Sequence, residues 1–285
     1  MKATGKGRLL VVATPIGNLG DLSPRAAAAL READAVAAED TRRTLKLFTH
    51  LGAPPPPMIS LPAFDERGRL GGILGRLRDG QTVALCTDAG TPGISDPGAA
   101  LVAAAWEAGA TVIPVPGPSA AASALAASGF PADRFFFAGF LPRKGGARRD
   151  ALALLARLPA TLVLYEAGNR TAETLGDLAA ALGDRPALVA RELTKLHEQL
   201  ERARLSELAV RFAGEVLGEV TLVVAPPAEG QLVAEPEVEP LEAELRRRLE
   251  AGEPPSALAR EVARARGLKR ADVYDAIERM KGREP

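Results

Sequence analysis

A strand that runs directly into a loop stiffened by glycine and proline is the feature that most constrains the fold of this chain. Residues Thr82–Gly98 read TVALCTDAGTPGISDPG, an apolar opening followed by three glycines and two prolines. Glycine lets a backbone approach a ligand closely, and proline holds a loop in one shape. Because α/β proteins bind ligands at the carboxyl ends of their strands, this segment predicts a ligand site beside a sheet.

The segment belongs to a longer alternation of strand-like and helical patterns. Strands are predicted at Arg8–Ala13, Ala35–Ala38, Met58–Leu61, Thr82–Cys86 and Thr111–Val115. Helices are predicted between them at Pro24–Arg31, Arg42–His50, Glu66–Arg78 and Pro97–Glu107, with Ser23 and Thr41 as the N-caps of the first two. This order predicts a sheet dominated by parallel strands, with helices on its faces.

The sequence Pro116-Gly117-Pro118 interrupts the alternation and marks a predicted domain boundary. An alanine-rich helix is predicted after Ser119, and a second set of strands and helices follows from Phe135 to Val224. Pro226–Pro240 is typical of a linker, and the helical tail after it has helix-turn-helix spacing. We expect α/β domains at 1–116 and 117–226, a linker at 227–240 and a small helical C-terminal tail at 241–285.

Composition excludes several classes of protein. The 36 basic and 36 acidic side chains give a net charge of zero, so any basic surface for nucleic acid must be local. Cys86 is the single cysteine and lies in an apolar strand, which favours a role in the core. No apolar run is long enough for a membrane span or a signal peptide, and no cluster has metal-ligand spacing. We expect a cytoplasmic protein with no metal and no membrane contact.

Polar residues at the predicted strand ends are candidates for chemistry. Glu39-Asp40-Thr41-Arg42-Arg43 follows one strand, where such residues serve either catalysis or helix capping. Asp88 follows another strand, and the glycines around it favour a functional role. The turn Thr14–Asp21 lacks the GxGxxG pattern, and no Walker A sequence is present. The basic loop Leu141–Arg149 is suited to phosphate contacts or is a solvated charge cluster.

Six motifs occur in one order along the chain: TPIGNLGDLS, AAEDTRRT, TDAGTPGISDPG, PVPGPSA, GFPADRFFFAGFLPRK and ARELTKLHE. As a set they resemble the tetrapyrrole-methylase superfamily and, within it, the ribosomal RNA small-subunit methyltransferase I family, from Leu9 to about Ala225. The resemblance implies an α/β fold of two domains, each a mixed sheet flanked by helices, with S-adenosylmethionine in the cleft between them. It also implies methylation of a cytidine ribose 2′-hydroxyl, cytidine 1402 in the decoding region of 16S rRNA. A homodimer acting on free rRNA or on the assembled 30S subunit is the family expectation.

The resemblance suggests roles for individual residues. Contacts to S-adenosylmethionine are expected from Pro15, Gly90, Gly93, Ile94, Ser95, Ser119, Ala120, Tyr165 and Ala190. The hydroxyl proton needs a base or an acceptor, for which the candidates are Asp88 first, then Glu39, Asp40 and Glu66. We expect RNA phosphates at Arg42, Arg143, Lys144, Arg170 and Lys195.

This sequence departs from the family pattern at two places. Phe64-Asp65-Glu66 stands where relatives usually carry His-Asn-Glu, and Ala167-Gly168-Asn169-Arg170 stands where they usually carry Ser-Pro-His-Arg. If either histidine were the general base, this chain would have lost it, or the family needs no histidine base.

Two other functions compete with rRNA methylation. A precorrin or porphyrin methyltransferase would share the fold and the cofactor but would act on a macrocycle, and the basic loop favours RNA over that substrate. The second competing function is a non-catalytic RNA-binding or assembly module. Measuring whether the chain binds the cofactor distinguishes such a module from an enzyme. The module is supported by the tail cations Arg246-Arg247-Arg248, Arg260, Arg264, Arg266, Lys269 and Arg270. A helical bundle that packs on the body or on a dimer partner explains the tail equally well.

Overall fold

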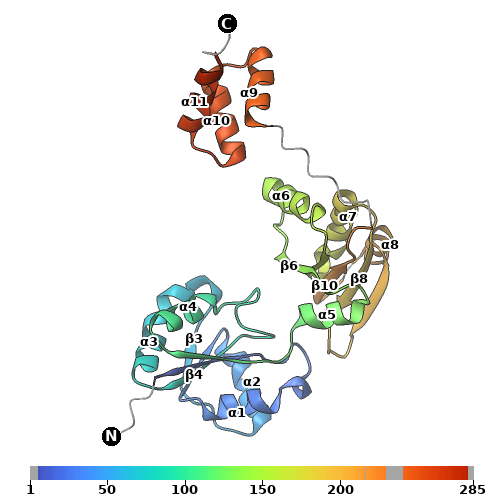
Figure 1. The fold of residues 1–285 in the computed structure, drawn as a ribbon. Helices are drawn as coiled ribbons and strands as arrows, with labels where there is room; N and C mark the ends of the chain where they lie inside the picture. Colours follow the sequence, from blue (N-terminus) through green and yellow to red (C-terminus); the bar gives the residue numbers. More distant parts are fainter. Residues whose placement is uncertain (1–5, 215, 229–239, 282–285) are drawn as a thin grey trace. The chain divides into compact units, whose positions relative to one another are not determined.

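The computed structural model describes residues 6–214, 216–228 and 240–281. The chain divides into two compact units, Met1–Leu232 and Val233–Pro285 (Figure 1). The described part of the first unit contains two five-stranded sheets, and that of the second contains three helices. Most of the predicted linker 227–240 lies outside the described residues, and a division of the first unit at residue 116 stays a prediction.

The first sheet is wholly parallel and has the strand order β3-β2-β4-β1-β5. Its strands are β1 (Arg8–Val12), β2 (Ala35–Ala38), β3 (Met58–Ser60), β4 (Thr82–Cys86) and β5 (Thr111–Val115). Strands β2 and β4 are buried along their whole length, which explains their continuous apolar runs. Cys86 is fully buried as expected, and burial raises the pKa of its thiol to about 12.

Helices cover both faces of the first sheet (Figure 1). On one face, α1 (Pro24–Glu32) and α2 (Thr41–Leu51) pack Leu30 and Phe48 against Leu10. On the other face, α3 (Glu66–Arg78) and α4 (Ala99–Glu107) pack Ile73 and Leu101 against Leu9. Leu9 and Leu10 point to opposite faces because side chains alternate along a strand.

Two helix starts differ from the prediction. Asp40, rather than Thr41, is the N-cap of α2, because its carboxylate accepts a hydrogen bond from the Arg42 amide. Helix α4 begins at Ala99 rather than Pro97, because Gly98 has a φ of 135°, far from helical values. Ser23 caps α1 as predicted and accepts a hydrogen bond from the Ala26 amide at 3.1 Å.

The second sheet is mixed and has the strand order β6-β7-β10-β8-β9. Its strands are β6 (Phe135–Phe140), β7 (Thr161–Ala167), β8 (Pro186–Arg191), β9 (Gln199–Arg204) and β10 (Glu219–Val224). Strands β6 and β7 pair in parallel, whereas β7–β10, β10–β8 and β8–β9 are antiparallel pairs. Helix α5 (Ala120–Ser128) covers one face, and α6 (Gly145–Ala156), α7 (Thr171–Leu182) and α8 (Leu205–Arg211) cover the other.

The C-terminal unit is a bundle of α9 (Leu241–Glu250), α10 (Pro255–Arg266) and α11 (Arg270–Lys281). Its core contains Leu245, Leu258, Val262, Val273 and Ile277. Gly267 ends α10 with a φ of 65°, a left-handed conformation that makes the turn of the predicted helix-turn-helix. The predicted helical tail is therefore confirmed.

The predicted fold class is confirmed: two sheets flanked by helices, followed by C-terminal helices. Within the described residues, three short 3-10 helices lie in the loops, at Leu19–Asp21, Ala63–Asp65 and Gly168–Arg170. Across the described ranges, we find no helix whose length and apolarity would let it cross a membrane.

Candidate active site

Two acidic side chains meet at the carboxyl edge of the first sheet, because β2 and β4 are neighbours there. Glu39 follows β2, and Asp88 follows β4. The Asp88 amide donates a hydrogen bond to Glu39 Oε2 at 3.2 Å, and the Asp40 amide donates to Asp88 Oδ1 at 3.1 Å. The parallel sheet thus joins two motifs that are far apart in the sequence.

The loop after β4 is joined to the loop after β1 by backbone hydrogen bonds. Thr14 and Gly90 each donate an amide to the other's carbonyl, at 2.8 and 3.0 Å. The Thr14 hydroxyl also donates to the Thr87 carbonyl at 3.1 Å. Gly90 has a φ of 82°, a left-handed conformation that glycine adopts without strain. These bonds hold the loop in one conformation beside the strand ends.

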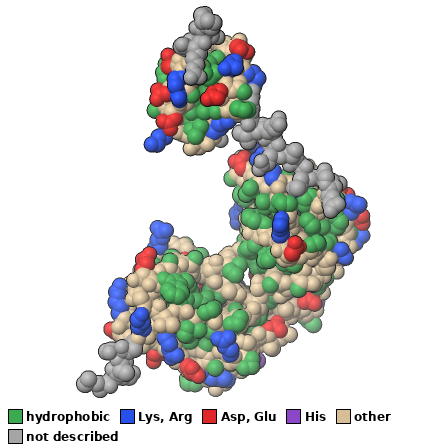
Figure 2. Space-filling view, in the orientation of Figure 1, with side chains coloured by type: hydrophobic (Ala, Val, Ile, Leu, Met, Phe, Trp, Pro, Cys, Tyr) green, Lys and Arg blue, Asp and Glu red, His purple; other side chains and the backbone are tan. Residues whose placement is uncertain are grey.

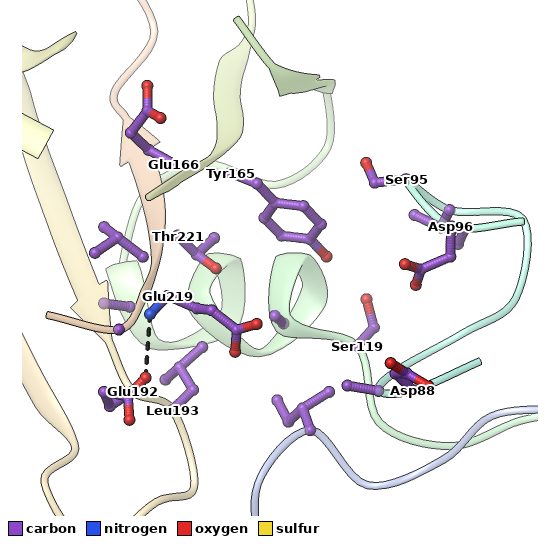
Figure 3. Close-up of a pocket in the computed structure, with 18 of the residues that line it drawn as sticks. Asp88, Ser95, Asp96, Ser119, Tyr165, Glu166, Glu192, Leu193, Glu219 and Thr221 are labelled. Atoms are coloured by element: carbon purple, nitrogen blue, oxygen red, sulfur yellow. Dashed lines mark hydrogen bonds between the residues drawn. The ribbon is translucent and has the colours of Figure 1, made fainter. Parts of the chain in front are cut away.

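A cavity of about 460 Å³ lies between this edge and the second sheet, within the first unit (Figure 3). Cofactor sites typically have roughly 300–1,000 Å³. The first sheet's loops and the start of α5 contribute Ile16, Glu39, Arg43, Asp88, Ala89, Gly90, Thr91, Ile94, Ser95, Asp96, Ser119 and Ala120. The second sheet and its loops contribute Phe140, Tyr165, Glu166, Ala167, Ala190, Glu192, Leu193, Lys195, Gly218, Glu219, Val220 and Thr221.

The lining of the cavity is acidic. Six of its residues carry a carboxyl group, and two carry a basic group, Arg43 and Lys195. The Glu166 carboxyl points away from the centre of the cavity in Figure 3. A cavity with this balance of charge stabilises a bound cation and opposes an anion.

The Asp88 carboxyl has a partner at each oxygen. Besides the Asp40 amide, Arg43 Nε lies 3.3 Å from Asp88 Oδ2. Burial raises the pKa values of both Asp88 and Glu39, and the charge of Arg43 opposes the shift. These contacts tie Arg43 and the start of α2 to the loop after β4.

Asp96 carries the most informative pKa of the cavity. Burial, and then the negative charges of Glu39, Asp88 and Glu219, raise the pKa of this carboxyl to about 7. Its carboxyl points into the cavity, as the Tyr165 hydroxyl does (Figure 3). Strongly perturbed acids in a cleft are candidates for proton transfer.

Sequence reasoning missed Asp96 as a site residue. Its position in the glycine- and proline-rich loop was an available signal. The preceding Ser95 has a φ of 62°, which is uncommon for a residue other than glycine and which concentrates at functional sites. No sequence pattern indicates that three other carboxylates surround Asp96, because they come from separate elements.

Most of the residues predicted to contact the cofactor line the cavity: Gly90, Ile94, Ser95, Ser119, Ala120, Tyr165 and Ala190. Pro15 and Gly93 do not line it. Pro15 is buried, and Gly93 has a φ of 80° and donates its amide to the Pro97 carbonyl at 3.2 Å. Gly93 therefore shapes the loop whose neighbours face the cavity.

Helix α5 begins beside the cavity, but two of its first amides already have partners. The Ala121 amide donates to the Tyr165 hydroxyl at 3.3 Å, and the Ala122 amide donates to Ser119 Oγ at 3.4 Å. The Tyr165 ring meets the Phe137 ring edge-on, with centroids 4.9 Å apart. Tyr165 is consequently a firmly held wall of the cavity, fixed at both its ring and its hydroxyl.

Two of the four base candidates lie outside the cavity lining, where they cap helices. Asp40 caps α2, and its ion pair with Arg42 at 2.7 Å lowers the pKa of the Asp40 carboxyl. Glu66 Oε1 accepts hydrogen bonds from the Gly98 and Leu101 amides, both at 3.1 Å, at the start of α4. Sequence alone did not distinguish these caps from catalytic acids.

The cations predicted to bind RNA are dispersed. Lys195 lines the cavity, where its Nζ lies 2.9 Å from carboxylate oxygens of both Glu192 and Glu219. Arg42 pairs with Asp40. On the face shown in Figure 2, lysines and arginines are scattered among acidic and apolar side chains.

The other three predicted RNA contacts lie in segments that follow strands of the second sheet. Arg143 and Lys144 are exposed on the loop between β6 and α6. Arg170 lies closer to the sheet, with Nη1 3.5 Å from Glu166 Oε1. Within the ranges that the structure describes, no group of three or more His, Cys, Asp or Glu residues is arranged to hold a metal ion.

The fold of the two sheets is shared with known methylases. The family model for tetrapyrrole (corrin/porphyrin) methylases matches residues 8–209. A uroporphyrin III C-methyl transferase from Thermus thermophilus has a TM-score of 0.56 and 24% identity, over 77% of this chain and 97% of that one. Another structure of that enzyme, complexed with S-adenosyl homocysteine, has a TM-score of 0.54 and 23% identity, again over 77% and 97%. The fold and site thus define a tetrapyrrole methylase.

Curated relatives narrow the class. The protein named ribosomal RNA small subunit methyltransferase I from Micromonospora olivasterospora is 46% identical to this chain over 276 residues. The match covers 96% of this chain and 87% of that protein. The one from Thermotoga maritima is 44% identical over 220 residues, covering 77% and 98%. The chain therefore belongs to the ribosomal RNA small subunit methyltransferase I family of tetrapyrrole methylases.

Proposed function

We propose that this chain transfers a methyl group from S-adenosylmethionine to a cytidine ribose 2′-hydroxyl in small-subunit rRNA, the site expected at cytidine 1402. The observation that carries the proposal is the acid-lined cavity at the carboxyl edge of the first sheet. Family membership supports the methyltransferase activity and the cofactor. The ribose position and the nucleotide are our proposal from the family resemblance.

The residues of the cavity fit S-adenosylmethionine. The cofactor carries a sulfonium and an ammonium group, which the carboxylates of Glu39, Asp88 and Asp96 favour electrostatically. When bound, it supplies an electrophilic methyl group. Gly90 brings the loop backbone close to the cavity, while Tyr165 and Ala190 provide an apolar wall suited to adenine.

Asp96 is the group best suited to accept the 2′-hydroxyl proton. A general base works best when its pKa lies near the working pH, and the Asp96 pKa of about 7 meets that condition. Asp88, the first candidate from sequence, has both oxygens engaged by Asp40 and Arg43. We assign Asp88 and Glu39 to shaping the cavity and Asp96 to accepting the proton at a carboxylate oxygen.

The acidic lining also disfavours the competing substrate. A porphyrin or precorrin macrocycle carries several carboxylates, which the acidic lining of the cavity would repel. An RNA strand needs only one ribose near the cavity while its phosphates remain outside. Arg143 and Lys144 are exposed and suited to those phosphates.

Labelled methyl transfer tests the proposal. Purified 30S subunits, free rRNA and a porphyrin are each incubated with the chain and tritiated S-adenosylmethionine, and the labelled product is then identified. We expect label on the 2′-oxygen of one cytidine. Label only on a base, or transfer only to a porphyrin, contradicts the proposal. Calorimetry that detects no cofactor binding favours the non-catalytic RNA-binding module.

Three further expectations accompany the proposal. We propose cytoplasmic localisation, because rRNA is the substrate, and a homodimer, because the family resemblance implies one. We also propose that residues 1–116 and 117–226 act as the two domains that enclose the cofactor. Light scattering of the purified chain measures the dimer directly.

A further inference from the structure

A buried arginine joins three elements behind the second sheet. Arg148 on α6 is 5% exposed, and each of its guanidinium nitrogens donates one hydrogen bond. Nε donates to Asp177 Oδ2 at 2.6 Å, Nη1 to the Pro142 carbonyl at 3.0 Å, and Nη2 to Thr174 Oγ1 at 3.0 Å. Because a buried charge is costly without partners, these three acceptors determine where the guanidinium lies.

The hydrogen bonds continue from Arg148 to the strand that borders the cavity. The Thr174 hydroxyl donates to Glu166 Oε2 at 2.6 Å, and the Ala167 amide donates to Glu166 Oε1 at 2.9 Å. Side chains alternate along β7, so Tyr165 faces the cavity while the Glu166 carboxyl points away from its centre (Figure 3). The Glu166 carboxyl meets Thr174 on α7. We refer to Arg148, Asp177, Thr174 and Glu166 as the Arg148 cluster.

The same arginine holds the basic loop by its backbone. Pro142 follows buried Leu141 and precedes the exposed residues Arg143 and Lys144. The loop begins immediately after Phe140, which lines the cavity. The Arg148 guanidinium thus holds the Pro142 carbonyl, which directly precedes Arg143 and Lys144 in the sequence. These two cations follow a residue of the cavity lining by only a few positions.

We propose that Arg148 is a positioning residue for the RNA substrate, holding the Leu141–Lys144 loop so that Arg143 and Lys144 meet a phosphodiester backbone beside the cavity. The inference rests on the proposed function, since it names how part of that substrate is bound. A loop held in its binding conformation before RNA arrives loses less conformational entropy on binding. Truncating Arg148 releases the loop and weakens RNA binding, although Arg148 itself does not touch RNA.

Arginine suits this role because of its shape. Its planar fork directs three donors to three acceptors at once, whereas a lysine ammonium on a flexible stem cannot reproduce that geometry. Lysine would keep the charge beside Asp177 and lose the bond to Pro142 or Thr174. Arg148→Lys should therefore restore stability more than it restores RNA binding.

Steady-state kinetics of Arg148→Met test the proposal. We expect KM for the RNA substrate to rise about ten-fold, with kcat and the Kd for S-adenosylmethionine within two-fold of the original chain. The cofactor cavity is spared because Glu166 keeps the Ala167, Thr174 and Arg170 contacts. Arg185→Met is the matched control: Arg185 is also 5% exposed, but its Nε donates to the Leu182 carbonyl. The control should leave KM for the RNA substrate unchanged.

A coupling measurement separates positioning from general damage. In a chain that already carries Arg143→Ala and Lys144→Ala, Arg148→Met should add less than a two-fold rise in KM, because the groups it positions are gone. If Arg148→Met does not fold, Thr174→Val replaces it and should raise KM three- to five-fold, because it removes the acceptor of Arg148 Nη2.

An unchanged KM in the folded Arg148 or Thr174 variant overturns the inference, as does a ten-fold rise that persists without Arg143 and Lys144. Failure of the original chain to methylate either RNA substrate instead overturns the proposed function. The two failures are therefore distinct in the same set of assays.

Discussion

The cavity edge of the first sheet and the Arg148 cluster behind the second sheet both contain several charged groups. Like charges are crowded together at the cavity, whereas opposite charges are paired in the cluster. At the cavity, Asp96 lies near Glu39, Asp88 and Glu219, and its pKa is raised. In the cluster, Arg148 meets Asp177 at 2.6 Å, and each of its nitrogens has an acceptor. Groups crowded by like charge can exchange a proton near neutral pH, whereas groups with complete partners fix geometry.

Asp96→Asn gives the largest expected effect. An amide cannot accept the hydroxyl proton, so we expect kcat to fall roughly 100- to 10,000-fold while cofactor affinity changes by less than ten-fold. Methyl transfer under saturating substrate and calorimetry with S-adenosylmethionine measure the two quantities. Asp88→Asn is the control and should lower kcat only about ten-fold, through Arg43. Normal turnover in Asp96→Asn together with a severe loss in Asp88→Asn would reverse the assignment.

The pH profile sharpens the same comparison. Because the carboxylate form of Asp96 accepts the proton and its pKa is about 7, kcat/KM should rise about ten-fold per pH unit below that value and level off above it. Arg148 is not among the residues that line the cavity, so Arg148→Met should leave the shape of the profile unchanged. A flat profile from pH 5 to pH 9 in the original chain contradicts Asp96 as the base.

Stability should respond with opposite signs in the two regions. The Asp96 pKa is about 7 in the folded chain and about 3.9 in the unfolded chain, so stability is lost as pH rises between these values. Asp96→Asn removes that loss and should raise Tm at pH 8 by roughly 2–4 °C, with a smaller gain at pH 5. Arg148→Met should lower Tm at both pH values, because it strands Asp177 and Thr174. Thermal unfolding at pH 5 and pH 8 measures both; a lower Tm for Asp96→Asn at pH 8 would contradict the charge argument.

The smallest expected effect concerns Glu66, a catalytic candidate from sequence that caps α4 in the structure. Glu66→Ala should reduce the free energy of unfolding by about 1 kcal/mol and change kcat by less than two-fold. Chemical denaturation and methyl transfer provide the two readings. Asp65→Ala is a neighbouring control, since the Asp65 carboxylate forms an exposed ion pair with Arg69 at 2.9 Å. A hundred-fold loss of turnover in Glu66→Ala would return Glu66 to the list of catalytic acids.

The strands were predictable because burial on both faces leaves a strong local pattern. The run TVALC in β4 has no polar interruption after Thr82, and the structure buries every residue in it. Helix starts were less predictable, because Asp40 and Thr41 are both good N-cap residues by type. Only the backbone conformation distinguishes them, because the N-cap residue is extended and the next residue is helical. That conformation depends on the path of the chain between the end of β2 and the start of α2.

The amino-acid sequence by itself determined the order of strands and helices, the ligand loop at Gly90 and the resemblance to a methylase family, because these depend on patterns within short segments. The tertiary structure decided which acid has a pKa near 7, which acids cap helices and which arginine holds the basic loop. Those properties depend on distances through space between Asp96, Glu39 and Glu219, or between Arg148 and Pro142. Burial and Coulomb energy follow such distances, and separation along the chain does not reveal them.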